Sequence, residues 1–158
     1  MSREPAGALV RQLATSREVL VVSSDFVTTP PDLLFAYWTQ PALLQQWWPP
    51  AAEIAPQVGG TYHLAWSAQG WHLRGHYTAF MTGRQLTFTW LWDHEPDSAA
   101  MVSVAFLPLG TMGTQLSITH GPYSDTAQGQ ERRQGNLDGW RHFMRRLHDV
   151  VAAEITAR

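Results

Sequence analysis

Residues 61–92 read TYHLAWSAQGWHLRGHYTAFMTGRQLTFTWLW, and apolar and polar side chains alternate along three runs of this stretch. Such alternation is typical of strands that bury one face. Gln69-Gly70 and Gly83-Arg84 separate the runs and read as tight turns. Short turns between alternating runs predict consecutive hairpins, and therefore an antiparallel sheet. The apolar side of the alternation consists of Tyr62, Leu64, Trp66, Trp71, Leu73, Gly75, Tyr77, Ala79, Leu86, Phe88, Trp90 and Trp92.

Further strands are expected on both sides of this stretch. Runs of β-branched and apolar residues predict a first strand at residues 18–27 and two later strands at 101–107 and 115–120. The last two are separated by a turn at 108–113.

Two short helices are expected after the first strand. The sequence Pro30-Pro31-Asp32 is a common helix start, and apolar residues continue to Trp38. A second helix begins near Pro41 and ends at the pair Trp47-Trp48, because Pro49-Pro50 cannot continue it.

A long amphipathic helix is expected near the C-terminus, where apolar residues recur at steps of three and four over about five turns. Its start is ambiguous, because Gly129, Gly135 and Gly139 each weaken a helix by about 1 kcal/mol relative to Ala. Gly139, next to Trp140, is alternatively a place where a neighbouring backbone approaches closely. The apolar stripe consists of Leu137, Trp140, Phe143, Met144, Leu147, Val150 and Val151.

These elements predict an α+β fold in which one long helix lies across a curved antiparallel sheet. The 158 residues fit one domain with a sizeable core. Residues 1–17 mix Gly, Pro, Ala and Arg without a clear period, which predicts a flexible arm or a short accessory helix. Residues 18–158 are expected to form the single domain.

The composition argues against several classes of function. The chain has no Cys, which excludes disulfides and thiolate chemistry. Its formal net charge is −2, and its 11 basic residues, all Arg, are spread along the chain, which argues against a nucleic-acid-binding surface. No apolar run approaches the roughly 18 residues of a membrane span, and the first residues lack the pattern of a signal peptide. We therefore expect no membrane insertion and a cytoplasmic location.

Six segments in this order resemble the SRPBCC (START-like) superfamily, in the branch related to the C-terminal domain of the activator of Hsp90 ATPase. The similarity covers about residues 18–153. The resemblance implies a helix-grip fold, in which an antiparallel sheet wraps around the long C-terminal helix and leaves a deep hydrophobic cavity between them. The segments are residues 29–39, 41–49 with the paired Trp, 59–62, 74–77, 84–90 and Gly139-Trp140.

The histidines do not predict a metal site. His72 and His76 share a strand face but lie about 13 Å apart at roughly 3.3 Å per residue, too far to bind one ion. His63 and His76 alternate with the apolar residues and are expected to face solvent. Neither a metal nor a cofactor is expected.

The eight Trp residues have two interpretations, an ordinary core or the walls of a pocket. The pocket interpretation predicts a non-enzymatic protein that binds a hydrophobic small molecule, with Trp supplying contact area and Tyr hydroxyl groups directing polarity. The expected lining residues are Trp48, Tyr62, Trp66, Tyr77, Phe88, Trp90, Trp140 and Met144.

Two alternatives remain open. The superfamily also includes polyketide cyclases and aromatases, and in such an enzyme Tyr77 or His120 would be the acid–base residue. No catalytic residue is otherwise indicated, because most carboxylates lie in loops and no Gly-x-Ser-x-Gly motif is present. The other alternative is a protein-interaction module, by analogy with the chaperone activator. A homodimer is plausible in this branch.

Overall fold

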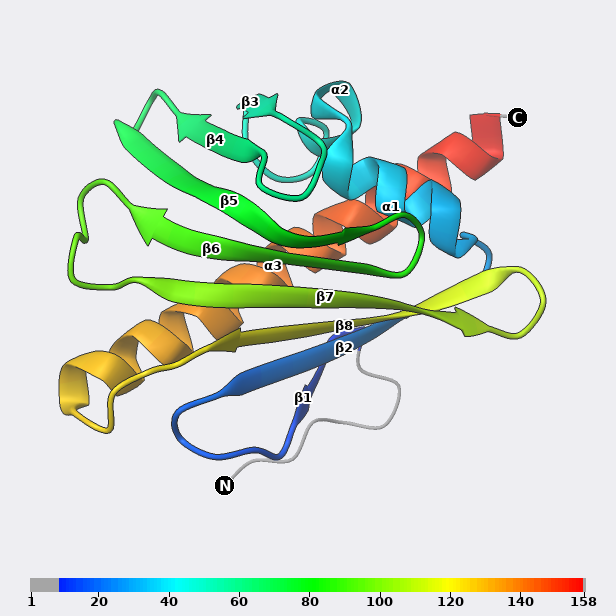
Figure 1. Ribbon diagram of the computed structural model, residues 1–158. Coiled ribbons are helices and arrows are strands. Elements are labelled where there is room, and N and C mark those ends of the chain that lie inside the picture. The colour runs from blue at the N-terminus through cyan, green and yellow to red at the C-terminus, as the bar shows by residue number, and fades with distance from the viewer. Residues whose placement is uncertain (1–8, 158) are drawn as a thin grey trace.

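The alternating stretch at residues 61–92 folds into three consecutive antiparallel strands, as its turns predict. The structure, a computed structural model, describes residues 9–157, with side chains for 9–154. Within these residues, eight strands form one antiparallel sheet in the order β1-β2-β8-β7-β6-β5-β4-β3 (Figure 1). The strands are β1 (Arg11–Leu13), β2 (Leu20–Phe26), β3 (Ala51–Ile54), β4 (Thr61–Trp66), β5 (Trp71–Met81), β6 (Gln85–Trp92), β7 (Ala100–Leu109) and β8 (Gly113–Gly121).

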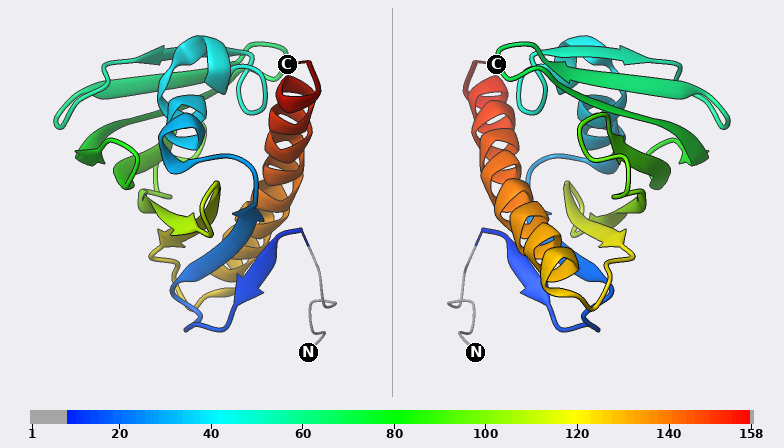
Figure 2. Two further views of the ribbon diagram at one scale, coloured as in Figure 1. Left: turned by 90° about the vertical axis from the view of Figure 1, so that its right-hand side faces the viewer. Right: turned by 90° about the vertical axis from the view of Figure 1, so that its left-hand side faces the viewer.

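Three helices accompany the sheet in the described residues: α1 (Pro31–Thr39), α2 (Pro41–Leu44) and α3 (Ala127–Ala157). Figure 2 shows α3 running along the concave side of the curved sheet, with α1 and α2 between the C-terminal half of α3 and the strands. The predicted helix-grip arrangement is confirmed. The interior of the molecule is therefore the space between the sheet and α3.

The inward face of the sheet is apolar because buried side chains occupy alternate positions. Cross-strand pairs such as Tyr77 with Phe88 and Val104 with Ile118 are buried together. Leu137, Met144 and Leu147 of α3 are also buried. At roughly 25 cal/mol per Å² of apolar surface, this shared interface is the main source of stability.

A β-bulge in β5 corrects the predicted alternation. The register with β6 shifts between Tyr77 and Ala79, so one residue of β5 has no partner. Past the bulge, Phe80 is opposite Leu86 and packs edge-on against Phe35, whereas Ala79 was predicted on this face. Bulges bend a strand and increase its twist, so this one contributes to the curvature of the sheet.

The second short helix ends earlier than predicted, at Leu44 rather than at Trp47-Trp48. A tighter turn follows the helix, with backbone hydrogen bonds that span three residues. These bonds run from the Gln46 amide to the Leu43 carbonyl and from the Trp47 amide to the Leu44 carbonyl. The indole Nε1 of Trp47 donates to the Tyr37 carbonyl at 2.9 Å, which fixes this turn against α1. Strand β3, which follows it, was not predicted.

Part of the expected N-terminal arm belongs to the sheet. Strand β1 pairs antiparallel with β2, and Arg11 on it forms an ion pair with Asp25 at 3.0 Å. A loose arm or accessory helix was therefore the wrong expectation for residues 11–13. Residues 1–8 lie outside the described residues. Among the described helices, none is both long and apolar enough to cross a bilayer.

Helix α3 begins at Ala127, well before the first residue of its predicted apolar stripe, and passes through all three glycines. The expectation that a backbone approaches Gly139 closely is wrong, because a Cβ there would meet no atom within 4 Å. The same holds for Gly135. Both glycines therefore face open space.

Gly75 in β5 is different, because a Cβ there would lie 2.1 Å from the Thr89 carbonyl oxygen. That oxygen belongs to the backbone of the neighbouring strand and cannot move aside without disturbing the sheet. We expect Gly75→Ala to lower the free energy of unfolding by about 2 kcal/mol or more, as overpacking does. Gly135→Ala is the matched control and should raise it by about 0.5–1 kcal/mol. Urea unfolding of both variants checks this, and equal effects would contradict it.

Candidate ligand-binding cavity

Two adjoining hollows lie between the sheet and the N-terminal half of α3. The inner hollow has a volume of about 220 Å³ and the outer one about 600 Å³. Trp90, Trp92, Gly135 and Asn136 line both, so they form one cavity with an inner and an outer part. The volume of the outer part lies within the range of about 300–1,000 Å³ that is typical of small-molecule sites, and the inner part adds to it.

Aromatic side chains from three regions of the chain surround the inner part. They come from the turn after α2, from strands β4 to β6, and from α3. On the α3 side, Gly135 and Gly139 leave room that any larger residue would fill. The aromatic lining consists of Trp48, Trp66, Trp71, Trp90, Trp92, Trp140 and Phe143.

Four of the eight predicted lining residues meet at this inner part: Trp48, Trp66, Trp90 and Trp140. Trp48 is the central one, with ring centroids 5.3 Å from Trp140, 5.9 Å from Trp90 and 6.4 Å from Trp66. It also packs against Trp38, 5.9 Å away. Trp48 thus contributes one face to the cavity and the other to the core.

The other predicted residues lie elsewhere. Tyr62, Tyr77 and Phe88 surround a gap of only about 10 Å³ beyond Trp48, which is too small for a ligand. The Tyr62 hydroxyl group donates to the Thr89 carbonyl at 2.6 Å. Met144 is fully buried and lines neither part of the cavity. The structure therefore places these four in the packed core.

A cluster of polar groups lies where the inner and outer parts meet. His120 is completely buried near the end of β8. The Trp140 indole donates from Nε1 to His120 Nδ1 at 3.0 Å. Asn136 on α3 lies between His120 and Tyr123, with its amide nitrogen 2.7 Å from the Tyr123 hydroxyl oxygen.

Burial moves the pKa values of these groups away from neutrality. Loss of solvation lowers the pKa of His120 to about 3, because the charged imidazolium is poorly solvated there. The same cause raises the pKa of Tyr123, and also that of Tyr77. Near pH 7, His120 is therefore neutral and both phenols keep their protons.

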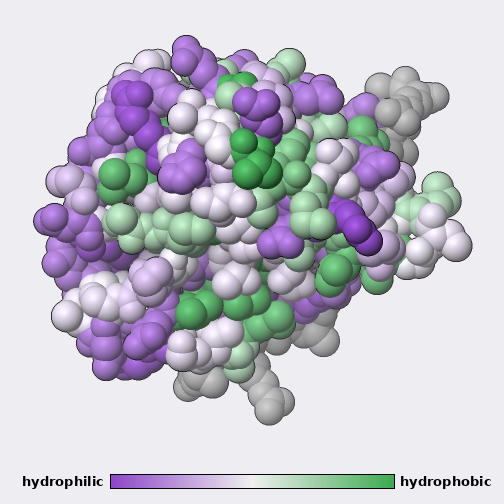
Figure 3. All heavy atoms as spheres, in the orientation of Figure 1, coloured by the Kyte–Doolittle hydropathy of each residue, from purple (hydrophilic) through white to green (hydrophobic). Residues whose placement is uncertain are grey.

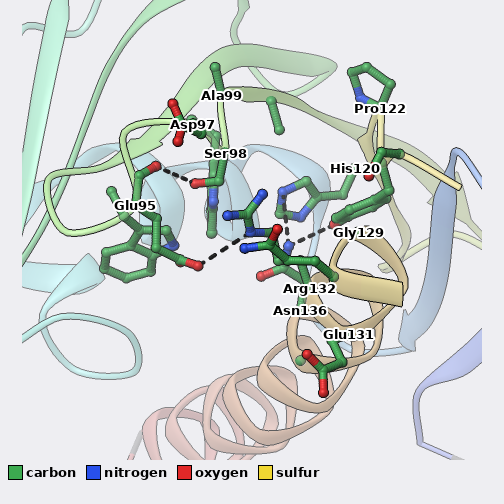
Figure 4. Close-up of a pocket in the computed structure, with 17 residues that line it drawn as sticks. Glu95, Asp97, Ser98, Ala99, His120, Pro122, Gly129, Glu131, Arg132 and Asn136 are labelled. Atoms are coloured by element: carbon green, nitrogen blue, oxygen red, sulfur yellow. Dashed lines mark hydrogen bonds and ion pairs between the residues drawn. The ribbon is translucent and has the colours of Figure 1, made fainter. Parts of the chain in front are cut away.

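The outer part opens between the loop at residues 93–99 and the start of α3. Figure 4 shows Glu95 and Ser98 on this loop facing Arg132 and Asn136 on the helix. Arg132 Nε lies 3.4 Å from a Glu95 carboxylate oxygen, so an ion pair spans the opening. Partly exposed pairs of this kind contribute little to stability.

The remaining histidines offer no metal site. His63 Nε2 lies 2.8 Å from His72 Nδ1, so the close pair is not the pair considered from the sequence. His63 is half-buried and His76 is exposed, so the solvent-facing prediction is only partly correct for His63. Among the described residues, no three His, Asp or Glu side chains are grouped to hold an ion.

Several lining residues were not identified from the sequence. Trp71 and Trp92 stood on the predicted apolar face, so the alternation could have identified them. Asn136 gave no signal of its own, because the start of the helix that carries it was ambiguous, and Tyr123 lies in the segment before the helix, for which nothing was predicted.

A curved antiparallel sheet around a long C-terminal helix, with a cavity between them, defines the helix-grip class of the SRPBCC superfamily. Residues 28–152 match the family described as Activator of Hsp90 ATPase homolog 1-like protein. The chain belongs to this family. No curated protein has a detectably similar sequence.

Solved structures show the same fold at low sequence identity. A protein from Mesorhizobium loti is 24% identical, with a TM-score of 0.75 and coverage of 85% of this chain and 97% of that one. An HSP90 activator from Plasmodium falciparum is 20% identical, with a TM-score of 0.67 and coverage of 85% and 96%. A protein of the dynemicin biosynthetic locus is 16% identical, with a TM-score of 0.72 and coverage of 85% and 47%. At these identities the similarity shows the fold alone.

The buried neutral state of His120 has a consequence for acid stability. In the unfolded chain His120 has the ordinary histidine pKa of 6.5, whereas in the folded protein its pKa is about 3. Between these two values the unfolded chain binds a proton at His120 that the folded protein does not bind. Stability is therefore lost as pH falls below 6.5, by about 1.4 kcal/mol per pH unit for one proton. We expect His120→Phe to reduce the slope of unfolding free energy against pH between 6 and 4 by that amount. His76→Phe makes the same substitution at an exposed position and is the comparison for His120→Phe. A wild-type slope in His120→Phe would contradict the assignment.

Proposed function

We propose that the protein binds a hydrophobic small molecule in the cavity between the sheet and α3, without performing chemistry on it. The observation that supports this most directly is the inner part of the cavity, where six Trp and one Phe surround about 220 Å³. This hollow reaches solvent, because Trp71 in its wall is 45% exposed. A ligand that fills it removes apolar indole surface from water, which is favourable.

The polarity of the cavity fits an oriented ligand. The inner walls are aromatic, whereas charged and polar side chains line the outer part. Flat indole rings offer large contact area to planar or hydrophobic molecules with little loss of side-chain entropy. In this proposal Trp48, Trp66, Trp90 and Trp140 contact the ligand, while Tyr62, Tyr77, Phe88 and Met144 support the wall behind them.

The cyclase alternative is less well supported by the geometry. Tyr77, one of the two candidate acid–base residues, lies beyond Trp48 and does not line either part of the cavity. His120 does line it, but burial lowers its pKa to about 3, which makes it a weak base near neutral pH. Binding without catalysis therefore accounts for more of what the site contains.

The interaction-module alternative rests on fold similarity to the Plasmodium falciparum activator, and a shared fold does not confer a shared partner. On the face shown in Figure 3, hydrophobic residues are interspersed with hydrophilic ones. The possible homodimer and the cytoplasmic location stay predictions.

Filling the inner part should abolish binding while preserving the fold. Because Gly139 faces open space in the cavity, Gly139→Leu places a side chain where the ligand would lie. We expect at least a tenfold loss of affinity for N-phenyl-1-naphthylamine, a neutral apolar probe, measured by its fluorescence increase. The free energy of unfolding should stay the same or rise by about 0.8 kcal/mol, because Leu favours helix over Gly.

Asp138→Leu is the matched control for this variant, because it adds the same side chain at the neighbouring, exposed position of α3. It should bind the probe as the wild type does. If Gly139→Leu bound the probe with wild-type affinity, the probe would lie outside the cavity and the proposal would fail. Independently of the probe, native mass spectrometry of the freshly purified wild type identifies any small molecule that the protein carries.

A further inference from the structure

We propose that the cavity selects neutral aromatic ligands that carry a hydrogen-bond acceptor such as a carbonyl group, which accepts from the Asn136 amide. This inference rests on the proposed binding function and specifies its ligand class. It follows from the direction of the hydrogen bonds around His120 and from the charges at the opening.

The direction starts at Trp140. An indole Nε1–H can only donate, so the 3.0 Å contact makes His120 Nδ1 an acceptor. A neutral imidazole has one acceptor and one donor nitrogen, so Nε2 carries the proton. Complete burial of His120, with its ring 4.6 Å from that of Trp90, holds the imidazole in this orientation.

The orientation of the Asn136 side-chain amide is set by the His120 Nε2–H donor. The nearest amide atom of Asn136 to His120 Nε2 is its nitrogen, at 3.5 Å, and two N–H groups cannot bond each other. Amide nitrogen and oxygen occupy nearly equivalent positions, and the hydrogen-bond network decides between them. With the oxygen at this position, it accepts from His120 Nε2–H and from the Tyr123 hydroxyl group, which lies 2.7 Å away.

In this arrangement the Asn136 NH₂ group makes no hydrogen bond to Trp140, His120 or Tyr123. Asn136 is half-buried and lines both parts of the cavity, so its NH₂ group is the donor of this network that a ligand in the cavity can reach. A ligand acceptor gives that group a hydrogen bond that a purely apolar ligand cannot give. Trp140 therefore orients Asn136 through His120, and Asn136 is the residue that donates the hydrogen bond to the ligand.

The charges at the opening decide against an anionic acceptor. The outer part is lined by three carboxylates, Glu95, Asp97 and Glu131, and by one guanidinium, Arg132, which gives 1 − 3 = −2. Arg132 is already paired with Glu95. A carboxylate ligand would pass these groups and lose its hydration among apolar walls, whereas a ketone or aldehyde would not.

Three naphthalene probes of similar shape test the inference: 2-acetylnaphthalene, 2-ethylnaphthalene and 2-naphthoate. Quenching of tryptophan fluorescence measures their dissociation constants. We expect the wild type to bind the acetyl compound about three- to tenfold more tightly than the ethyl compound, as one neutral hydrogen bond allows. The naphthoate should bind most weakly.

Asn136→Asp keeps the shape of the side chain and removes its donors, so the ratio between acetyl and ethyl compounds should fall to about one. Gln134→Glu makes the same chemical change at an exposed residue of α3 that lines neither part of the cavity, and it should keep the wild-type ratio. Asn136→Leu is a second variant without a donor, and circular dichroism confirms that each variant is folded.

The outcomes separate the two proposals. If the wild type binds the acetyl and ethyl compounds equally, the cavity binds ligands but the donor inference is wrong. If the naphthoate binds most tightly, the inferred selection against anions is wrong. If the ratio persists in both Asn136 variants, Asn136 is not the donor. If none of the probes binds, the binding function itself fails.

Discussion

The packing of Trp48 between the sheet and α3 determines how the interior of this protein is divided. Its ring contacts Trp38 and Trp47 on one side and Trp66, Trp90 and Trp140 on the other. Beyond it, the end of the molecule under α1 and α2 is filled by side chains around Tyr62 and Tyr77. Toward the N-terminal half of α3, the space stays open. Trp48 therefore belongs to the packed core and also forms part of the cavity wall.

The polar cluster at His120 is understandable only beside this aromatic wall. Burying an imidazole costs free energy unless its nitrogens find partners, and here Trp140 satisfies Nδ1. The backbone amide of Tyr123 donates to the Glu18 carbonyl at 2.7 Å, which ties the segment after β8 to the turn before β2. Tyr123 and Asn136 are thus held by different elements that meet at one point, and a rigid meeting point is what orients a ligand.

Most of the fold could be predicted from the sequence, because alternation along residues 61–92 and the apolar stripe of α3 are local signals. The bulge after Tyr77 could not, since it is a property of the pairing with β6 and it exchanges Ala79 for Phe80 on the inner face. For the cavity, the Trp residues were visible as bulky apolar positions. Which Trp residues pack in the core and which line the cavity depends on distances across the interior, and the periodicity of the sequence does not contain them. Asn136 differs from other polar residues of the helix only because the fold places His120 beside it.

The glycines of α3 favour a cavity over an imperfectly packed core. Gly135 and Gly139 each destabilise a helix by about 1 kcal/mol relative to Ala, and neither is required by a close contact. If the space beside them served only packing, any larger residue would improve both the helix and the core. Both instead line the part of the molecule where Trp48, Trp90 and Trp140 leave volume unfilled. The helix gives up intrinsic stability at the two positions where a side chain would occupy the cavity, which is the arrangement expected of a protein that keeps this space for a ligand.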